Sequence, residues 1–172
     1  ALSRAGLEAS DIGLVIAGGC NPDYMSPADA CTIAASMGME VPAFDVNSAC
    51  TSYHAGLYNL ALMRPEALPE FVLVVTPETV TTTVDYSDRA GAVLWGDGTT
   101  AAIVSTKVPS RIEIHGNTMA SNPSAFDKVT IGHNDHFTQE GRTVQMFAIK
   151  KTIRVLRGLQ KKYEDPGRKL HF

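Results

Sequence analysis

Two segments with helical periodicity separate three short apolar runs, and this alternation limits the fold more than any other feature of the sequence. The runs at residues 11–18, 43–46 and 71–75 carry so few polar side chains that neither face of such a strand suits contact with water. Residues 27–37 begin with a proline suited to the first turn of a helix, and residues 50–63 repeat apolar side chains at helical spacing. Alternating buried strands and helices predict a layered α/β fold.

The remainder of the chain predicts a less regular pattern. Apolar residues 92–95 and 100–104 flank a Gly-Asp-Gly sequence, which is typical of a tight turn between two adjacent strands. Residues 111–119 alternate as a strand does, and residues 120–139 are polar as a loop is. Residues 140–163 carry an apolar stripe at helical spacing and predict a long helix.

Composition and cysteine usage exclude several classes of protein. The 172 residues are 44% hydrophobic and 19% charged, which is typical of a soluble globular domain, and the net charge of −3 gives no general attraction for nucleic acid. No apolar run approaches the ~18 residues of a membrane-spanning helix. The three cysteines form no Cys-x-x-Cys pair, and their odd number argues against a disulfide framework. We therefore expect a cytoplasmic protein without a metal site, a membrane segment or a nucleic acid partner.

Cys50 lies between the apolar run at residues 43–46 and the helix expected at residues 50–63. The N-terminus of a helix favours the thiolate form of a cysteine, and its N–H groups can stabilise an oxyanion. A strand–turn–cysteine–helix unit is therefore suited to covalent acyl transfer. On the pattern alone, a small buried core residue is the more common interpretation of such a cysteine.

Four stretches resemble one known family. Residues 43–50, Ala-Phe-Asp-Val-Asn-Ser-Ala-Cys, resemble the nucleophile segment of β-ketoacyl-acyl-carrier-protein synthase III, a family of the thiolase superfamily. Residues 85–89 resemble its Asp-x-x-Asp-Arg stretch, and residues 95–101 resemble its Phe-Gly-Asp-Gly-Ala-Gly-Ala turn. Residues 141–148 resemble the start of its Gly-x-x-Val-Phe-x-x-Ala helix, with Gln145 in place of the Phe. The matches keep the family's order and span nearly the whole chain, which favours the nucleophile interpretation of Cys50.

The resemblance implies a thiolase-like layered α/β/α fold with a mixed sheet. It covers most of the first half of the family's duplicated fold, residues 1–107, which lacks its first strand and bears the nucleophile. Residues 108–172 correspond to the start of the second half. The chain is accordingly expected to be an incomplete part of a longer enzyme.

The resemblance also implies the activity. Cys50 would take an acyl group from acyl-CoA, and malonyl-acyl-carrier protein would then condense with it by decarboxylation, at the initiation of fatty acid biosynthesis. CoA thioester would be a substrate and no cofactor would be needed, Arg89 would contact the CoA nucleotide, and the enzyme would be a homodimer. The basic face of the helix at residues 140–163 would help to dock the acidic carrier protein, unless it is only a solvated surface.

Two alternatives stay open. The family's catalytic His stands in a His-Gln-Ala-Asn motif, and neither this motif nor the family's catalytic Asn is found among the 172 residues. The chain could therefore be an inactive partner or fragment. Residues 47–52 also depart from the family's Ala-Cys-Ala-Gly, so that a relative that transfers the acyl group to another acceptor in secondary metabolism is possible.

For several other residues, an ordinary structural or surface role stands beside the functional interpretation. Arg89 could instead pair with a neighbouring aspartate. His54 lies one helical turn after Cys50 but has no counterpart in the family, so a packed or solvated histidine is expected. The polar-loop histidines His133 and His136 are expected to be solvated. The cysteines Cys20 and Cys31 are expected to be small core residues. Ser26 lies near the position where the family carries a bulky aromatic residue, which leaves the length of the acyl chain open.

Overall fold

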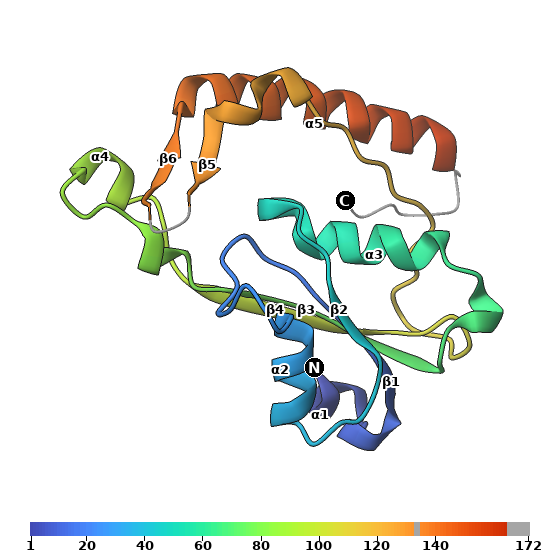
Figure 1. Ribbon diagram of the computed structural model, residues 1–172. Coiled ribbons are helices and arrows are strands. Elements are labelled where there is room, and N and C mark those ends of the chain that lie inside the picture. Colours follow the sequence, from blue (N-terminus) through green and yellow to red (C-terminus); the bar gives the residue numbers. More distant parts are fainter. Residues whose placement is uncertain (133–134, 165–172) are drawn as a thin grey trace. The chain divides into compact units, whose positions relative to one another are not determined.

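The computed structural model describes residues 1–132 and 135–164, which form two compact units. The first unit is Ala1–Arg111 and the second is Ile112–Phe172 (Figure 1). The correspondence of residues 1–107 and 108–172 to two halves of a duplicated fold stays a prediction. No helix among the described residues combines the length and apolarity needed to cross a bilayer.

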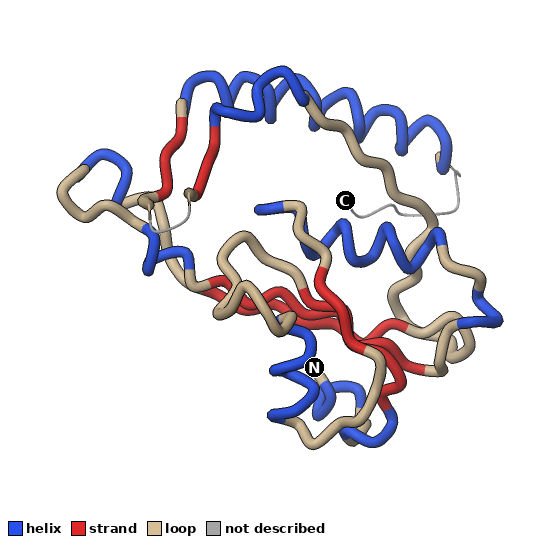
Figure 2. The backbone as a smooth tube through the Cα atoms, viewed as in Figure 1, coloured by secondary structure: helices blue, strands red, loops and turns tan. Residues whose placement is uncertain are grey.

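The first unit is built on a four-stranded mixed sheet (Figure 2). Its strands are β1 (Ile12–Ala17), β2 (Ala43–Asp45), β3 (Phe71–Glu78) and β4 (Gly98–Val104). Their order is β2-β1-β3-β4, where β1 pairs in parallel with both β2 and β3, and β4 runs antiparallel to β3. The predicted mixed α/β fold is confirmed. The strands β1 and β3 are largely buried as expected, whereas β2 is only half-buried and its Asp45 is exposed.

Helices cover both faces of this sheet (Figure 1). They are α1 (Leu2–Ala5), α2 (Asp29–Ser36) and α3 (Ser52–Leu62). Because side chains of a strand alternate between faces, Val15 packs with Ala34 of α2, whereas Ile16 packs with Leu60 of α3. Both strand residues are fully buried, which explains why β1 has no polar face.

The hairpin expected around the Gly-Asp-Gly sequence is wrong. Only its second half is a strand, β4, and this strand pairs with β3 along its whole length, from Val72 opposite Val104 to Glu78 opposite Gly98. The first half ends the short helix α4 (Arg89–Ala92) and continues as a turn. Asp88 starts this helix by accepting a hydrogen bond from the Ala90 N–H at 3.0 Å, a local capping interaction that outweighs the β-propensity of the residues that follow.

Short 3₁₀ helices connect the main elements. They are η1 (Ala9–Asp11), η2 (Ala49–Thr51), η3 (Pro65–Ala67), η4 (Val80–Thr83) and, in the second unit, η5 (Pro123–Lys128). The η2 turn leads directly into α3, so the helix expected from residue 50 has a tighter first turn than the pattern alone indicates.

The second unit contains the long helix α5 (Gly141–Tyr163), as predicted, and a small hairpin. The hairpin strands are β5 (Val129–Ile131) and β6 (Phe137–Gln139), and the hydroxyls of Thr130 and Thr138 lie 2.8 Å apart across it. Residues 120–139 are therefore not only a loop. The strand expected at residues 111–119 is also wrong, because an alternating pattern forms a strand only where a partner offers its backbone, and β5 and β6 pair with each other.

Candidate active site

The candidate site lies where the three parallel strands of the first unit end. Cys20 follows the carboxyl end of β1, Cys50 follows that of β2, and Glu78 is the last residue of β3. In open α/β sheets this edge is where ligands bind, because loops that leave neighbouring strands converge there. The fold thus brings together residues that are up to 58 positions apart in the sequence.

Three polar side chains hold the turn around Cys50. Asn47 Oδ1 accepts from the Ala49 N–H at 3.1 Å, and Thr51 Oγ1 donates to the Ser48 carbonyl at 2.8 Å. Ser52 Oγ accepts from the Ser48 N–H at 2.9 Å and donates to the Ala49 carbonyl at 2.7 Å. The polar sequence around the cysteine therefore supplies the hydrogen bonds that fix residues 47–52, which we call the nucleophile turn.

Ala49 has a positive φ of 47°, a left-handed conformation that is unusual for any residue other than glycine. It costs about 1–2 kcal/mol and persists where the surrounding contacts require it. Here the hydrogen bonds from both ends of the nucleophile turn hold Ala49, so the following residue is presented at a sharp bend between strand and helix. Such strain is characteristic of sites that present a nucleophile.

Cys50 is exposed and has a free thiol. Among the described residues, no acceptor takes the Cys50 N–H, although the N–H groups of Ala49 and Thr51 on either side are hydrogen-bonded. The cysteine also precedes the N-terminus of the eleven-residue helix α3, where the positive end of the helix dipole lies. The geometry therefore offers a reachable thiol beside an N–H donor that is available to an oxyanion.

Two glycines after β1 allow close approaches, Gly18 to the nucleophile turn and Gly19 to the end of β3. A Cβ atom on Gly18 would overlap the Val46 carbonyl oxygen and lie 2.9 Å from Ser52 Cβ. A Cβ atom on Gly19 would lie 2.8 Å from the Pro77 carbonyl oxygen and 3.1 Å from Glu78 Oε1. Residues 18–20 are thus wedged between the nucleophile turn and the end of β3, which leaves no room for a side chain at either glycine.

Cys20 is half-buried and hydrogen-bonded, and the expectation of a plain core residue is wrong. Its thiol donates to Glu78 Oε2 at 3.2 Å and its backbone N–H donates to Glu78 Oε1 at 3.0 Å. Burial, with the Glu78 hydrogen bond and charge, raises the pKa of the Cys20 thiol to about 12, and the Cys50 charge adds to this. Cys31 was also expected in the core, but it is exposed on α2 because its position falls on the solvent face of that helix.

Asp45 and Asp29 fix the start of α2. The Asp45 carboxylate accepts from the N–H groups of Asp29 at 2.8 Å and Ala30 at 2.9 Å, which are N–H groups of the first helical turn. Asp29 is itself buried and accepts from the Asp23 N–H at 3.3 Å. The loop at residues 18–28, which carries Cys20, is therefore anchored at both ends.

Arg89 is the first residue of α4 and is exposed. Its neighbours Asp85 and Asp88 accept local hydrogen bonds, from Ser87 and Ala90 respectively. The ion pairs found among the described residues do not include Arg89, so the expected alternative of a salt bridge to a neighbouring aspartate is not observed.

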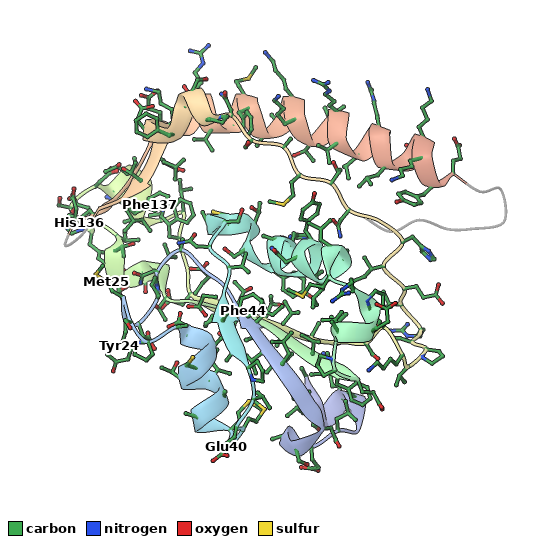
Figure 3. All side chains as sticks on the ribbon, turned by 45° about the vertical axis from the view of Figure 1, so that its right-hand side comes forward. Tyr24, Met25, Glu40, Phe44, His136 and Phe137 are labelled. Carbon is green, nitrogen blue, oxygen red and sulfur yellow. The ribbon has the colours of Figure 1, made fainter. Side chains whose placement is uncertain are left out.

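The remaining candidates lie apart from the thiol chemistry. His54 is exposed on α3, and its ring meets that of Tyr53 edge-on at 5.7 Å, as expected for a packed surface histidine. Tyr24 and Met25 project outward from the loop before α2 (Figure 3), and the Ser26–Pro27 bond is cis. His133 lies outside the described residues. No group of three metal-ligating side chains occurs in the part of the chain that the structure describes.

Sequence reasoning missed Glu78, Ser52 and the Asp45–Asp29 pair. The repeated Asn, Ser and Thr around Cys50 signal local hydrogen bonds to the backbone and could have pointed to Ser52. For Glu78 the only signal is an acidic residue at the end of a buried strand, which gives no indication of its partner 58 positions away.

Known proteins are similar to this chain in sequence and in fold. The family model described as 3-oxoacyl-[acyl-carrier-protein] synthase III matches residues 44–123, which contain the nucleophile turn, β3, Arg89 and β4. The β-ketoacyl-[acyl-carrier-protein] synthase III of Oceanobacillus iheyensis is 31% identical over 170 residues, and the match covers 96% of this chain. The chain belongs to the 3-oxoacyl-[acyl-carrier-protein] synthase III family.

Other members of the synthase III family are also similar to this chain. The enzyme of Nitratidesulfovibrio vulgaris is 36% identical over 138 residues, 79% of this chain and 41% of its own length. The crystal structure of the synthase III from Aquifex aeolicus superposes with a TM-score of 0.86 at 26% identity, over 94% of this chain and 53% of that one. The predicted thiolase-like fold is confirmed. The chain spans about half the length of these relatives, 54% in the case of the Oceanobacillus enzyme.

Proposed function

We propose that the protein is a β-ketoacyl-acyl-carrier-protein synthase III that uses Cys50 as its nucleophile. The observation that carries the proposal is the nucleophile turn, where an exposed thiol precedes a helix and lies beside an N–H donor without an acceptor among the described residues. Family membership supports the reaction class, because the relatives are named for this condensation.

In the first step, the Cys50 thiolate attacks the thioester carbonyl of acyl-CoA. The C–S bond to CoA breaks, CoA leaves as a thiolate that takes a proton, and the acyl group remains on Cys50. The Cys50 N–H, which has no acceptor among the described residues, would stabilise the oxyanion of the tetrahedral intermediate. Covalent storage divides one difficult transfer into two easier steps.

In the second step, malonyl-acyl-carrier protein loses CO₂, and the resulting carbanion attacks the acyl–Cys50 thioester. A C–C bond forms, the thioester to Cys50 breaks, and the products are a β-ketoacyl-carrier protein and the regenerated thiol. The family's His and Asn would assist this decarboxylation, and their motif is not among the 172 residues, so the step is proposed for the whole protein.

Binding residues and partners follow from the same proposal. Arg89 would hold the phosphates of CoA, which a guanidinium suits well, and its exposed position at the start of α4 supports this role. The basic residues of α5 would attract the acidic carrier protein, and they are Lys150, Lys151, Arg154, Arg157, Lys161 and Lys162. A cytoplasmic homodimer at the start of fatty acid biosynthesis completes the proposal, with CoA thioester as a substrate and no cofactor.

A condensation assay with the full-length gene product tests this function. Acetyl-CoA or longer acyl-CoAs with malonyl-acyl-carrier protein should yield the β-ketoacyl-carrier protein and CO₂, Cys50→Ala should abolish the product, and Cys31→Ser should retain it. Acylation of Cys50 without condensation in the full-length protein would contradict the synthase function and indicate a different acyl acceptor.

A further inference from the structure

Two thiols lie at the same edge of the sheet, and the proposed function uses only one. Cys20 and Cys50 follow neighbouring parallel strands, and Gly18 packs directly against Val46 and Ser52 of the segment that carries Cys50. The two thiols are close enough for the Cys50 charge to raise the pKa of Cys20. An acyl-CoA thioester that reaches Cys50 therefore approaches a second sulfur that is chemically able to form the same thioester.

Glu78 occupies both donors of Cys20. One carboxylate oxygen, Oε1, accepts from the backbone N–H at 3.0 Å and the other, Oε2, accepts from the thiol at 3.2 Å. The backbone of Glu78 ends β3 opposite Gly98 of β4, and a Cβ atom on Gly19 would lie 3.1 Å from Glu78 Oε1, so the carboxylate lies close against the chain that carries Cys20.

The Glu78 carboxylate affects the reactivity of Cys20. A thiol that donates to a carboxylate keeps its proton, because the neighbouring negative charge opposes a thiolate and the hydrogen bond is lost on ionisation. Only a thiolate attacks a thioester at a useful rate. Cys50, by contrast, is exposed and makes no hydrogen bond to Glu78 among the described residues.

We propose that Glu78 is a selectivity residue that holds Cys20 as a neutral thiol, so that acylation is confined to Cys50. The proposal rests on the proposed function in that it takes Cys50 to be the acylated residue. The reaction that Glu78 suppresses is attack of Cys20 sulfur on the acyl carbon of acyl-CoA, with release of CoA thiol and formation of an acyl–Cys20 thioester. An acyl group on Cys20 would be misplaced for the condensation.

The test is the rate at which each cysteine is alkylated by iodoacetamide, read by peptide mass spectrometry on the full-length protein at pH 8. The cysteine sulfur displaces iodide from the reagent and the thiol proton is lost to solvent. Cys31 is exposed and has no role in the proposed reaction, so its alkylation rate is the internal reference. A thiol pKa near 12 instead of 9 leaves about 1000-fold less thiolate, and the greater nucleophilicity of a more basic sulfur offsets part of this. Wild-type Cys20 should therefore react at least ~10-fold more slowly than Cys31.

Glu78→Gln isolates the carboxylate charge. The amide oxygen can still accept from the Cys20 N–H, so the loop keeps its anchor while the thiol loses its acceptor. Cys20 alkylation should rise by at least ~5-fold relative to Cys31. Glu66→Gln, at an exposed position on η3, is the matched control and should leave the ratio unchanged. An unchanged ratio in Glu78→Gln, or a wild-type Cys20 that reacts as fast as Cys31, would overturn the proposal, and the second result needs no variant to fold.

Acylation gives a separate readout. After incubation with acyl-CoA, Glu78→Gln should carry acyl groups on both Cys20 and Cys50, and the double variant Glu78→Gln with Cys20→Ser should carry one on Cys50 alone. If neither cysteine of the wild type is acylated, the proposed function fails, whereas the alkylation ratio still decides whether Glu78 controls Cys20.

Discussion

The hydroxyl of Ser52 donates to the carbonyl oxygen of Ala49 at 2.7 Å and so closes the backbone around Cys50. The Ser52 hydroxyl oxygen also accepts from the Ser48 N–H at 2.9 Å, and Ser52 is 2% exposed. A single buried hydroxyl thus joins the strand side and the helix side of the nucleophile turn. It also opposes the relaxation of Ala49 from its left-handed conformation.

Ser52→Ala should therefore weaken both the fold and the nucleophile. Loss of the hydroxyl leaves a buried N–H and a carbonyl without this partner, which costs about 1–3 kcal/mol of unfolding free energy. Chemical denaturation and the rate of Cys50 alkylation measure the two effects. Ser36→Ala is the control. It removes an exposed hydroxyl that donates a hydrogen bond to the Ile33 carbonyl on α2, and it should change neither quantity appreciably. Equal behaviour of the two variants would contradict the role given to Ser52.

Gly18→Ala should disrupt the contact between β1 and the nucleophile turn. The new methyl group would meet the Val46 carbonyl and the Ser52 side chain, and overpacking of this kind costs typically about 1–3 kcal/mol. Gly96→Ala is the control, since a Cβ atom there meets nothing within 4 Å. Thermal unfolding should separate the variants, with a clearly lower midpoint for Gly18→Ala alone. A midpoint equal to that of the control would show that the close approach is not as the structure has it.

Asp29→Asn should stabilise the protein at neutral pH. Burial raises the pKa of the Asp29 carboxyl above its usual value, and the charges of Asp45, Asp23 and Glu78 act in the same direction, against the hydrogen bond from the Asp23 N–H. The folded state therefore binds this proton more tightly than the unfolded state. The contribution of Asp29 to the unfolding free energy is greatest below about pH 4 and is lost as the pH rises through the folded-state pKa.

Denaturation of wild type and Asp29→Asn across a pH series measures this contribution. The neutral amide keeps an oxygen to accept from the Asp23 N–H, and the variant should gain stability relative to wild type as the pH rises from about 4 towards 7. Glu66→Gln, an exposed change, should show a flat difference over the same range. If the stability advantage of Asp29→Asn over wild type decreased with rising pH, the result would contradict a raised pKa for Asp29.

Arg89→Gln should raise the KM for acyl-CoA by about 10–100-fold, as expected for the loss of charge-assisted hydrogen bonds to phosphate. The matched substrate is the corresponding acyl-pantetheine, which lacks the nucleotide and should show no such change. Arg64→Gln, on an exposed residue before η3, controls for the loss of one positive charge. Equal increases for both substrates would remove Arg89 from the nucleotide site.

Local patterns predicted the elements that bury an apolar face. The apolar runs of β1 and β3 and the periodicity of α3 and α5 were sufficient, because burial of these faces is what holds the elements in place. Residues 92–95 were assigned wrongly, since Val93 and Leu94 are 74% and 64% exposed and the Asp88 cap determines their conformation. A helix cap depends on local side-chain hydrogen bonds, and a strand depends on a distant partner. The pattern of apolar residues reports neither.

The candidate site was predictable only in part. Cys50 could be identified from its place between a strand and a helix and from the resemblance of residues 43–50 to a known nucleophile segment. The partnership of Cys20 with Glu78 could not, because it depends on which strands become neighbours in the sheet. Strand order is a property of the whole fold, and no window of the sequence encodes it.

The most direct test of the account is intact-protein mass spectrometry of the full-length protein after incubation with acetyl-CoA and longer acyl-CoAs. The account predicts one acyl adduct per chain that hydroxylamine removes, that is present in Cys31→Ser, and that is absent from Cys50→Ala. A folded full-length protein that forms no adduct, or an adduct that persists in Cys50→Ala, would contradict the assignment of Cys50 as the nucleophile.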